Sequence, residues 1–336
     1  MSRHFLGFLA AGLLAAAVAT PAHAAPLKIA TLSPDGSMWM TKMRAGAATI
    51  KARTEGRVEF KFYTGGTMGT DKAVLSKIRI GQLHGGALTG GSLAEAARDI
   101  QVYSLPLKFR GFEEVDHVRG KMDPQLSKQL EEGGFVNFGF AEGGFAYAMS
   151  KNAPVTSVAT LRKQRVWIPD NDHQSELGMK VFQVSPVPLS LADVLPSLQT
   201  GIIDTVASSP IGAVALQWHT QVKYLTDLPL SYFVGTLAID KKAFARLAPA
   251  DQAVVREVMT RVFREIDAQN RKDNVSAYAA LLKQGIKPVK PSAAEVSDWE
   301  KNGQAATARM IQEGIVSAGA AQQLDTLLAA ARAGKK

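Results

Sequence analysis

The pattern of apolar and polar positions predicts a chain in which short strands and helices follow one another. The first apolar run, over 27–30, predicts a buried strand, and Ser37 is placed to cap a helix with apolar residues at helical spacing. Alternation over 57–63 predicts a half-buried strand. A glycine-rich break, a short helix ending at Gly81 and a strand and loop of small residues over 85–91 follow. This order of strand, helix and strand predicts an α/β fold.

The middle of the chain continues in the same way after a polar helical segment that ends near Glu132. An extended stretch is predicted over 135–147, and a short strand over 165–169 is ended by its proline. A capping box at 190–193 predicts a helix that Pro196 should bend, followed by a strand toward residue 206.

The last third of the chain is helical. Apolar residues recur every four positions from 254 to 266, which predicts one amphipathic helix over 249–284, about 50 Å long. A second capping box, formed by Ser292 and Glu295, predicts another helix that runs to about Ile315.

The first 24 residues have the pattern of a secretory signal peptide. A basic start at Arg3 is followed by an apolar run over 5–18, and small residues stand at Ala22 and Ala24 before the expected cleavage. The run is shorter than the roughly 20 residues of a membrane-spanning helix. The chain has no cysteine, so disulfides and lipid attachment at the cleavage site are excluded. We expect a mature chain of roughly 310 residues, enough for two domains, in the periplasm.

Charge and motifs give little support to nucleic-acid binding or catalysis. The 39 basic and 30 acidic residues are scattered, and no basic block is interleaved with aromatics. Residues 65–72 lack the ending of a phosphate-binding loop, and neither a nucleophile elbow nor a thiol is present. The polar cluster around His173 could hold a metal or act in acid–base chemistry, but Asp172 before it is better explained as a helix cap. We expect no metal ion and no cofactor, and an exported hydrolase is the less favoured reading.

Seven segments, in this order, resemble the DctP-type solute-binding proteins of TRAP transporters, the tripartite ATP-independent periplasmic carriers. Each motif is weak alone, but their order along nearly the whole mature chain is fairly specific. The segments are 27–30, 54–60, 65–71, 80–83, 188–190, 198–204 and 247–252.

The resemblance implies an α/β, two-lobed periplasmic-binding-protein fold, with a cleft between the lobes and the helix over 249–284 crossing both. It implies a first lobe of 26–145 with 232–268 and a second lobe of 146–231 with 269–325. The implied partners are a small-molecule solute and the TRAP membrane permease subunits, to which the solute is delivered. A signal-receptor partner is an alternative that composition does not separate from transport.

One departure from the family pattern bears on the solute. The family usually has an arginine in a Lys-x-Arg-x-Pro strand and another after a Gly-Phe pair, and both bind the carboxylate of the solute. Here the two positions are Trp167 and Ala146. A carboxylate buried without its partner costs about 3–5 kcal/mol, which is two to three orders of magnitude in affinity.

The loss of both arginines predicts an apolar, aromatic or lipid-like solute. Arg165 stands on the same strand face as Trp167, so an organic acid held by Arg165 remains an alternative. A branch of the family that lacks the arginine works with a periplasmic helical-repeat protein, which the resemblance implies as a further partner here.

The predicted site combines aromatic residues with residues that follow predicted strands, where ligands bind in α/β proteins. Core packing is the competing explanation for each aromatic. The candidate residues are Trp39, Leu88, Thr89, Gly90, Phe145, Tyr147, Arg165, Trp167, Asp170, Asn171, Ser208, Ser209 and Trp218.

Overall fold

The strands and helices form an α/β structure around one mixed sheet. The computed structural model describes residues 26–170 and 172–334, so the predicted signal peptide lies outside the described residues. Within them, nine strands form one sheet in the order β11-β9-β5-β10-β3-β1-β2, with β4 paired to β10 and β8 paired to β5. Strands β6 and β7 form a separate pair. The strands are β1 (Leu27–Thr31), β2 (Phe60–Tyr63), β3 (Gly85–Thr89), β4 (Phe135–Val136), β5 (Ala141–Ser150), β6 (Trp167–Pro169), β7 (Val187–Leu189), β8 (Thr205–Ser208), β9 (Tyr224–Thr226), β10 (Ser231–Asp240) and β11 (Lys287–Val289).

The helices lie around this sheet, and the described residues also contain four short 3₁₀ segments. The α-helices are α1 (Met38–Arg53), α2 (Asp71–Arg79), α3 (Phe112–Glu132), α4 (Val158–Leu161), α5 (His173–Val181), α6 (Val194–Thr200), α7 (Pro210–Ala215), α8 (Lys241–Ala245), α9 (Pro249–Lys283), α10 (Ala293–Gln312) and α11 (Ala318–Ala333). The 3₁₀ segments are η1 (Gly91–Leu93), η2 (Arg98–Ser104), η3 (Leu191–Asp193) and η4 (Trp218–Thr220). Among these elements, no helix is both long and apolar enough to cross a membrane.

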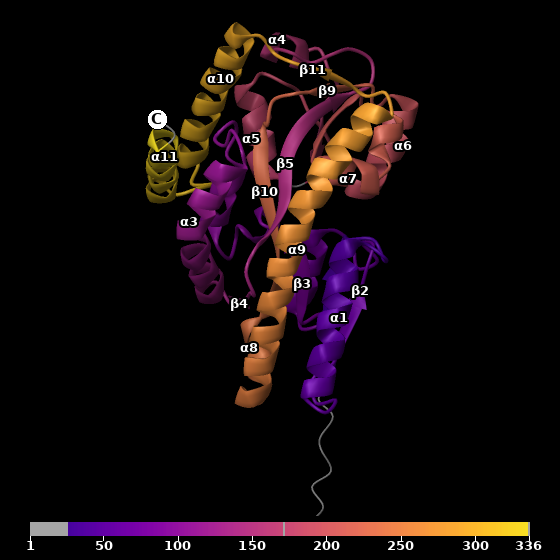
Figure 1. Cartoon of the computed structure of the whole chain (residues 1–336), viewed down its shortest axis with the longest axis vertical. Coiled ribbons are helices and arrows are strands. Elements are labelled where there is room, and N and C mark those ends of the chain that lie inside the picture. Colours follow the sequence, from indigo (N-terminus) through magenta and orange to yellow (C-terminus); the bar gives the residue numbers. More distant parts are fainter. Residues whose placement is uncertain (1–25, 171, 335–336) are drawn as a thin grey trace, which may run out of the picture.

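The molecule has two lobes that share β5, β10 and α9 (Figure 1). We call the part built on β1, β2, β3 and α1 lobe I, and the part built on β8, β9, α6 and α7 lobe II. One half of β10 pairs with β3 and the other half with β5, so this strand passes from one lobe to the other. The residue boundaries predicted for the lobes stay a prediction, and α3 and α11, which that prediction assigns to different lobes, pack in one apolar cluster.

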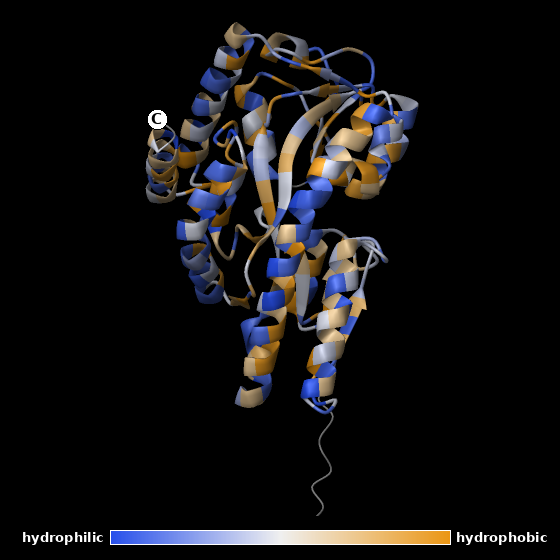
Figure 2. Ribbon diagram, in the orientation of Figure 1, coloured by the Kyte–Doolittle hydropathy of each residue, from blue (hydrophilic) through white to orange (hydrophobic). Residues whose placement is uncertain are grey.

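Helix α9 confirms the long amphipathic helix predicted from the sequence. It spans 35 residues and alternates apolar and polar positions along its length (Figure 2). Its apolar side includes Val258, Val262 and Ile266, which are buried. Helix α1 lies close against it because Gly46 has no side chain: a Cβ there would stand 2.7 Å from Val262. This packing fixes α1, and with it the first turn that bears Trp39, on the lobe I end of α9.

Local capping follows the predicted pattern at several helices but not at α6. Ser37 caps α1, and the reciprocal capping box of Ser292 and Glu295 opens α10. The helix predicted from residue 190 begins instead as η3, and α6 starts at Val194. Pro196 therefore stands in the first turn of α6, where its missing N–H breaks no helical hydrogen bond, and not inside the longer helix predicted from residue 190.

The extended stretch predicted over 135–147 is divided into β4 and β5. A bulge in β5 opposite Phe233 interrupts its pairing with β10. A Cβ at Gly143 would lie 2.0 Å from the Phe233 ring, and Gly144 has a φ of +99°, which favours glycine. These two glycines permit the bulge at the point where β5 and β10 cross between the lobes.

Candidate functional site

The carboxyl end of β3 in lobe I is held by a buried carboxylate. Thr89 donates its backbone N–H and its hydroxyl to Asp71 Oδ2, at 3.1 and 3.0 Å, and Ser92 Oγ donates to the same oxygen at 2.9 Å. Asp71 is the first residue of α2 and is 9% exposed. Sequence reasoning missed it, although it closes the matched segment 65–71.

Burial raises the pKa of the Asp71 carboxyl, and the three hydrogen bonds it accepts oppose this shift only in part. The raised pKa means that ionisation costs more in the folded chain than in the unfolded chain, whose ordinary value is 3.8. Asp71→Asn keeps the acceptor oxygen and removes the charge.

We therefore expect the free energy of unfolding of the wild type, relative to Asp71→Asn, to fall as the pH rises from about 4 through the raised pKa. Urea unfolding of both proteins, from about pH 3 to about pH 7, measures this difference. A wild type that gains stability over the variant across the same range would contradict the assignment.

Four of the predicted residues come together in lobe I. A Cβ at Gly235 of β10 would lie 3.0 Å from the Trp39 ring and 3.2 Å from the carbonyl oxygen of Leu88. Gly90, two residues after Leu88, donates its N–H to Val234 O at 2.8 Å. Trp39 also meets Phe263 of α9 edge to face, at 5.7 Å between ring centroids. Trp39, Leu88, Thr89 and Gly90 thus lie around the start of η1.

Two predicted tryptophans form a pair in lobe II. The rings of Trp167 and Trp218 meet edge to face, with centroids 5.1 Å apart. Trp167 is 7% exposed and donates its indole N–H to Leu189 O at 3.0 Å, and Trp218 is 2% exposed. The pair belongs to the apolar cluster of lobe II, so most of both rings packs against protein.

Tyr147 and Ser208 are cross-strand neighbours on β5 and β8. The Tyr147 ring lies 5.7 Å from that of Tyr278 on α9, and burial raises the pKa of Tyr147 to about 12. Ser209, which follows β8, accepts the N–H of Gly212 at 3.3 Å and caps α7.

The structure does not bring Phe145 to the tryptophan pair. Its ring packs against Tyr232, at 5.3 Å, and Phe112, at 5.1 Å, in a cluster that Trp167 does not join. Asp172 caps α5 by accepting the N–H of Ser175 at 3.0 Å, which confirms the helix-cap explanation. Asn171 lies outside the described residues, and Asp170 is partly buried beside it.

Arg165 forms an ion pair beside the N-terminal end of β8, whereas the predicted serines lie at the C-terminal end of this strand. Its guanidinium lies 3.1 Å from Asp204 Oδ2, and its backbone N–H donates to Asp204 Oδ1 at 2.8 Å. Asp204 immediately precedes β8, whereas Ser208 ends that strand. Four residue-to-residue steps of extended chain separate Asp204 from Ser208 by roughly 13 Å.

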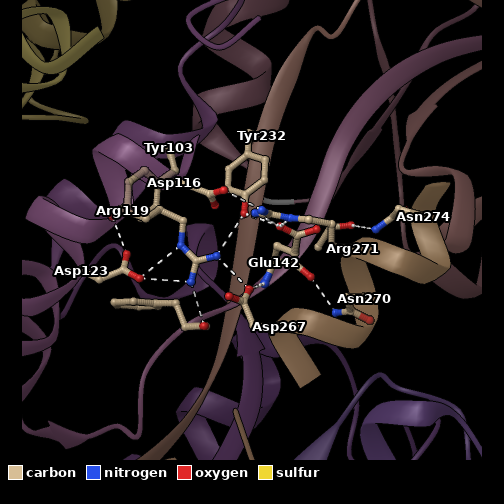
Figure 3. Close-up of polar contacts among 12 residues, drawn as sticks. Tyr103, Asp116, Arg119, Asp123, Glu142, Tyr232, Asp267, Asn270, Arg271 and Asn274 are labelled. Carbon is tan, nitrogen blue, oxygen red and sulfur yellow. Dashed lines mark hydrogen bonds and ion pairs between the residues drawn. The ribbon is translucent and has the colours of Figure 1, made fainter. Parts of the chain in front are cut away.

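A buried polar network lies where the lobes join, and sequence reasoning missed it (Figure 3). Arg119 of α3 is 8% exposed. Its guanidinium donates to Asp267 of α9 at 2.8 Å, to Asp123 at 3.1 Å, to the Tyr232 hydroxyl at 3.2 Å and to the Phe140 carbonyl at 2.9 Å. One cation thereby connects α3, α9, β10 and the segment before β5.

The second half of this network is centred on Glu142 of β5, which is fully buried. Arg271 donates twice to Glu142 Oε2, at 2.8 and 3.1 Å, and the Tyr232 hydroxyl donates to the same oxygen at 3.2 Å. Asn270 donates to the Glu142 carbonyl at 2.6 Å. Burial raises the pKa of Glu142, and Arg271 opposes this shift. These bonds join β5 to α9 beside the bulge.

Comparison with known proteins identifies the family to which this chain belongs. Residues 29–313 match the model of the bacterial extracellular solute-binding proteins, family 7, called DctP. The chain belongs to this family. Proteins of the DctP family are transport proteins that bind small solutes and work with membrane permease subunits, and the family is not one of enzymes.

Two characterised relatives of this DctP-family chain are periplasmic binding proteins. The C4-dicarboxylate-binding periplasmic protein DctP of Rhodobacter capsulatus is 26% identical over 264 residues, which cover 75% of this chain and 76% of the relative. The 2,3-diketo-L-gulonate-binding periplasmic protein YiaO of Escherichia coli is 25% identical over 205 residues, 60% of this chain and 62% of the relative. The chain thus spans less than two thirds of YiaO.

Solved structures show that the DctP-type fold extends over the described chain. A TRAP periplasmic solute-binding protein of Ralstonia eutropha, with bound (S)-2-acetolactate, superposes with a TM-score of 0.83 at 18% identity and covers 90% of this chain and 98% of that one. The sugar-acid-binding protein DctPAm of Advenella mimigardefordensis, in complex with galactonate, gives 0.82 at 15% identity, with coverage of 91% and 98%.

Proposed function

We propose that this DctP-family protein binds an apolar, aromatic or lipid-like solute and delivers it to the membrane permease subunits of a TRAP-type system. The proposal includes export to the periplasm by residues 1–24, and a periplasmic helical-repeat protein as a further partner. The predicted binding residues of both lobes belong to this proposal, with Trp39 and Thr89 on one side and the Trp167 pair on the other.

The ion pair that Arg165 forms with Asp204 is the observation that favours a neutral solute most strongly. The two positions that bear carboxylate-binding arginines in the family pattern are Trp167 and Ala146 here. Arg165 is paired to Asp204, and that pair lies roughly 13 Å along β8 from Ser208. A solute carboxylate near Ser208 would therefore lack the guanidinium that the alternative requires.

The carboxylate beneath Thr89 supports the same conclusion by electrostatics. Asp71 is buried and accepts hydrogen bonds from the neutral groups of Thr89 and Ser92. Coulomb repulsion between buried like charges is stronger than in water because the protein interior screens it less. An anionic solute close to Thr89 would be repelled by the ionised form of Asp71, whereas a neutral one would not.

An organic acid is the second candidate, and the ligands named for related structures favour it. The structures compared above hold acetolactate and galactonate. A small acid in this chain would need a cation, and Arg165 is the candidate that the sequence offers near the predicted site.

A thermal-shift screen with matched solutes separates the two candidates. The panel pairs each aromatic or aliphatic carboxylate with its primary amide, because a ligand that binds the folded state raises its apparent stability by mass action. We expect the amides to raise the melting temperature more than the matching carboxylates do. In Asp71→Asn we expect a smaller difference in melting-temperature shift between amides and carboxylates. Shifts produced by acids alone, and lost in Arg165→Ala, would contradict a neutral solute and establish the second candidate.

A further inference from the structure

A row of basic residues crosses the end of lobe II that lies opposite Ser208, at the other end of β8. Backbone hydrogen bonds connect its members: Lys287 N to Lys223 O at 2.9 Å, Lys223 N to Ser150 O at 2.8 Å, and Lys151 N to Asp204 O at 2.8 Å. Asp204 N then donates to the carbonyl of Arg165 at 3.1 Å. We call Lys151, Arg165, Lys223 and Lys287 the basic edge.

The basic edge follows the ends of neighbouring strands, and β9 and β11 mark its place in Figure 1. Adjacent strands are about 4.8 Å apart, so the four intervals of the row span roughly 19 Å. Ser208 is at the far end of β8 from this row. Arg165 is thus the one member of the basic edge that is also a predicted solute residue, and the three lysines lie at the opposite end of the strands from Ser208.

One of the four cations on this edge is paired to a carboxylate. Asp204 is 5% exposed and is paired to Arg165, whose side chain is 53% exposed. Lys223 and Lys287 are exposed, and neither forms an ion pair within the part of the chain that the structure describes. Lys151 caps the C-terminus of α6 by donating to Leu198 O at 2.6 Å. The edge thus keeps an excess of positive charge at the surface.

An exposed apolar side chain adjoins the basic edge. Ile202 is 54% exposed and stands two residues before Asp204, in the turn that follows α6. Amphipathic surfaces that combine lysines with a large apolar side chain are typical of proteins that lie against lipid headgroups. Protein interfaces, in contrast, are depleted in lysine and enriched in aromatic residues.

We propose that the basic edge, together with Ile202, docks reversibly on the anionic headgroups of a phospholipid membrane. Lysine ammonium groups bind lipid phosphates as point charges, and each contributes roughly fivefold to affinity near an anionic surface. Association by a few exposed cations weakens as salt is added, because exposed charges are screened over about a Debye length. Weak binding of this kind lets the protein leave the surface again.

Sedimentation with vesicles tests this docking surface. The purified protein is mixed at low ionic strength with vesicles of phosphatidylcholine alone, or of phosphatidylcholine with phosphatidylglycerol. We expect binding to the anionic vesicles only, and its loss on addition of salt. The double variant Lys223→Glu/Lys287→Glu should bind at least about 25-fold more weakly, and Lys223→Gln/Lys287→Gln should show an intermediate loss.

The matched control is Lys121→Glu/Lys301→Glu, which makes the same change in net charge on exposed positions of α3 and α10. We expect this control to bind as the wild type does. Equal loss in both charge-reversal variants would overturn the proposal, because net charge alone would then explain binding. Absence of wild-type binding to anionic vesicles would also overturn it, as would binding only to an acidic polypeptide that the edge variant loses.

Discussion

Arg119→Met is expected to lower the free energy of unfolding by about 3–5 kcal/mol, as happens when one partner of a buried ion pair is removed. The methionine nearly keeps the volume but leaves Asp123 and Asp267 without the guanidinium that both contact. The Phe140 carbonyl and the Tyr232 hydroxyl also lose a donor. Burial alone lowers the pKa of Arg119, but the neighbouring acidic groups outweigh it and raise the pKa, which indicates how strongly the cation is held. Urea unfolding followed by circular dichroism measures the change.

Arg44→Met is the matched control for this prediction. Arg44 forms an ion pair with Asp35 at 2.7 Å, but its side chain is 49% exposed. An exposed pair of this kind contributes at most about 1 kcal/mol. Equal losses in the two variants would show that burial does not strengthen the network at the lobe junction.

Trp167→Ala is expected to lower the free energy of unfolding by about 3–5 kcal/mol and to abolish retention of the solute. The truncation leaves a cavity beside Trp218 and removes the indole N–H that Leu189 O accepts. Trp167→Phe retains most of the ring and so provides a folded variant in which only the indole edge is changed. Unfolding measurements and solute retention are compared for both.

Trp299→Ala separates loss of stability from loss of binding. Trp299 is as deeply buried as Trp218, donates its indole N–H to Thr156 O at 2.9 Å and packs against Phe182 at 5.7 Å between centroids. It lies in the cluster that contains α10 rather than the one that contains Trp167. We expect a similar loss of stability with solute retention intact. If Trp299→Ala and Trp167→Ala lost the solute equally, the Trp167 pair would have no specific part in binding.

The elements of this fold that depend on nearby residues could be predicted from the sequence. The four-residue recurrence from Val254 to Ile266 fixes one face of a helix, and Ser37 and Ser292 satisfy the free N–H groups of their helix starts through residues three positions away. Pro196 shows the limit of such local reasoning, because its effect depends on where the helix begins.

The polar contacts of Asp71 and of Arg119 could not be predicted in this way. Asp71 and Thr89 are 18 positions apart, and Arg119 and Asp267 are 148 apart, so no periodicity joins them. Nor does strand alternation say how Phe145 is placed, since the bulge at Gly143 and Gly144 precedes it. Burial of Trp167 likewise depends on the cluster around it and not on its place in the sequence.

The chemical nature of the solute is the central claim, and mass spectrometry of the compound that co-purifies with the protein tests it most directly. The protein is purified without denaturation, and its small molecules are released and identified. We predict a neutral apolar, aromatic or lipid-like compound that Trp167→Phe retains less well and that Arg165→Ala retains fully. A small carboxylate whose retention is lost in Arg165→Ala would contradict the account.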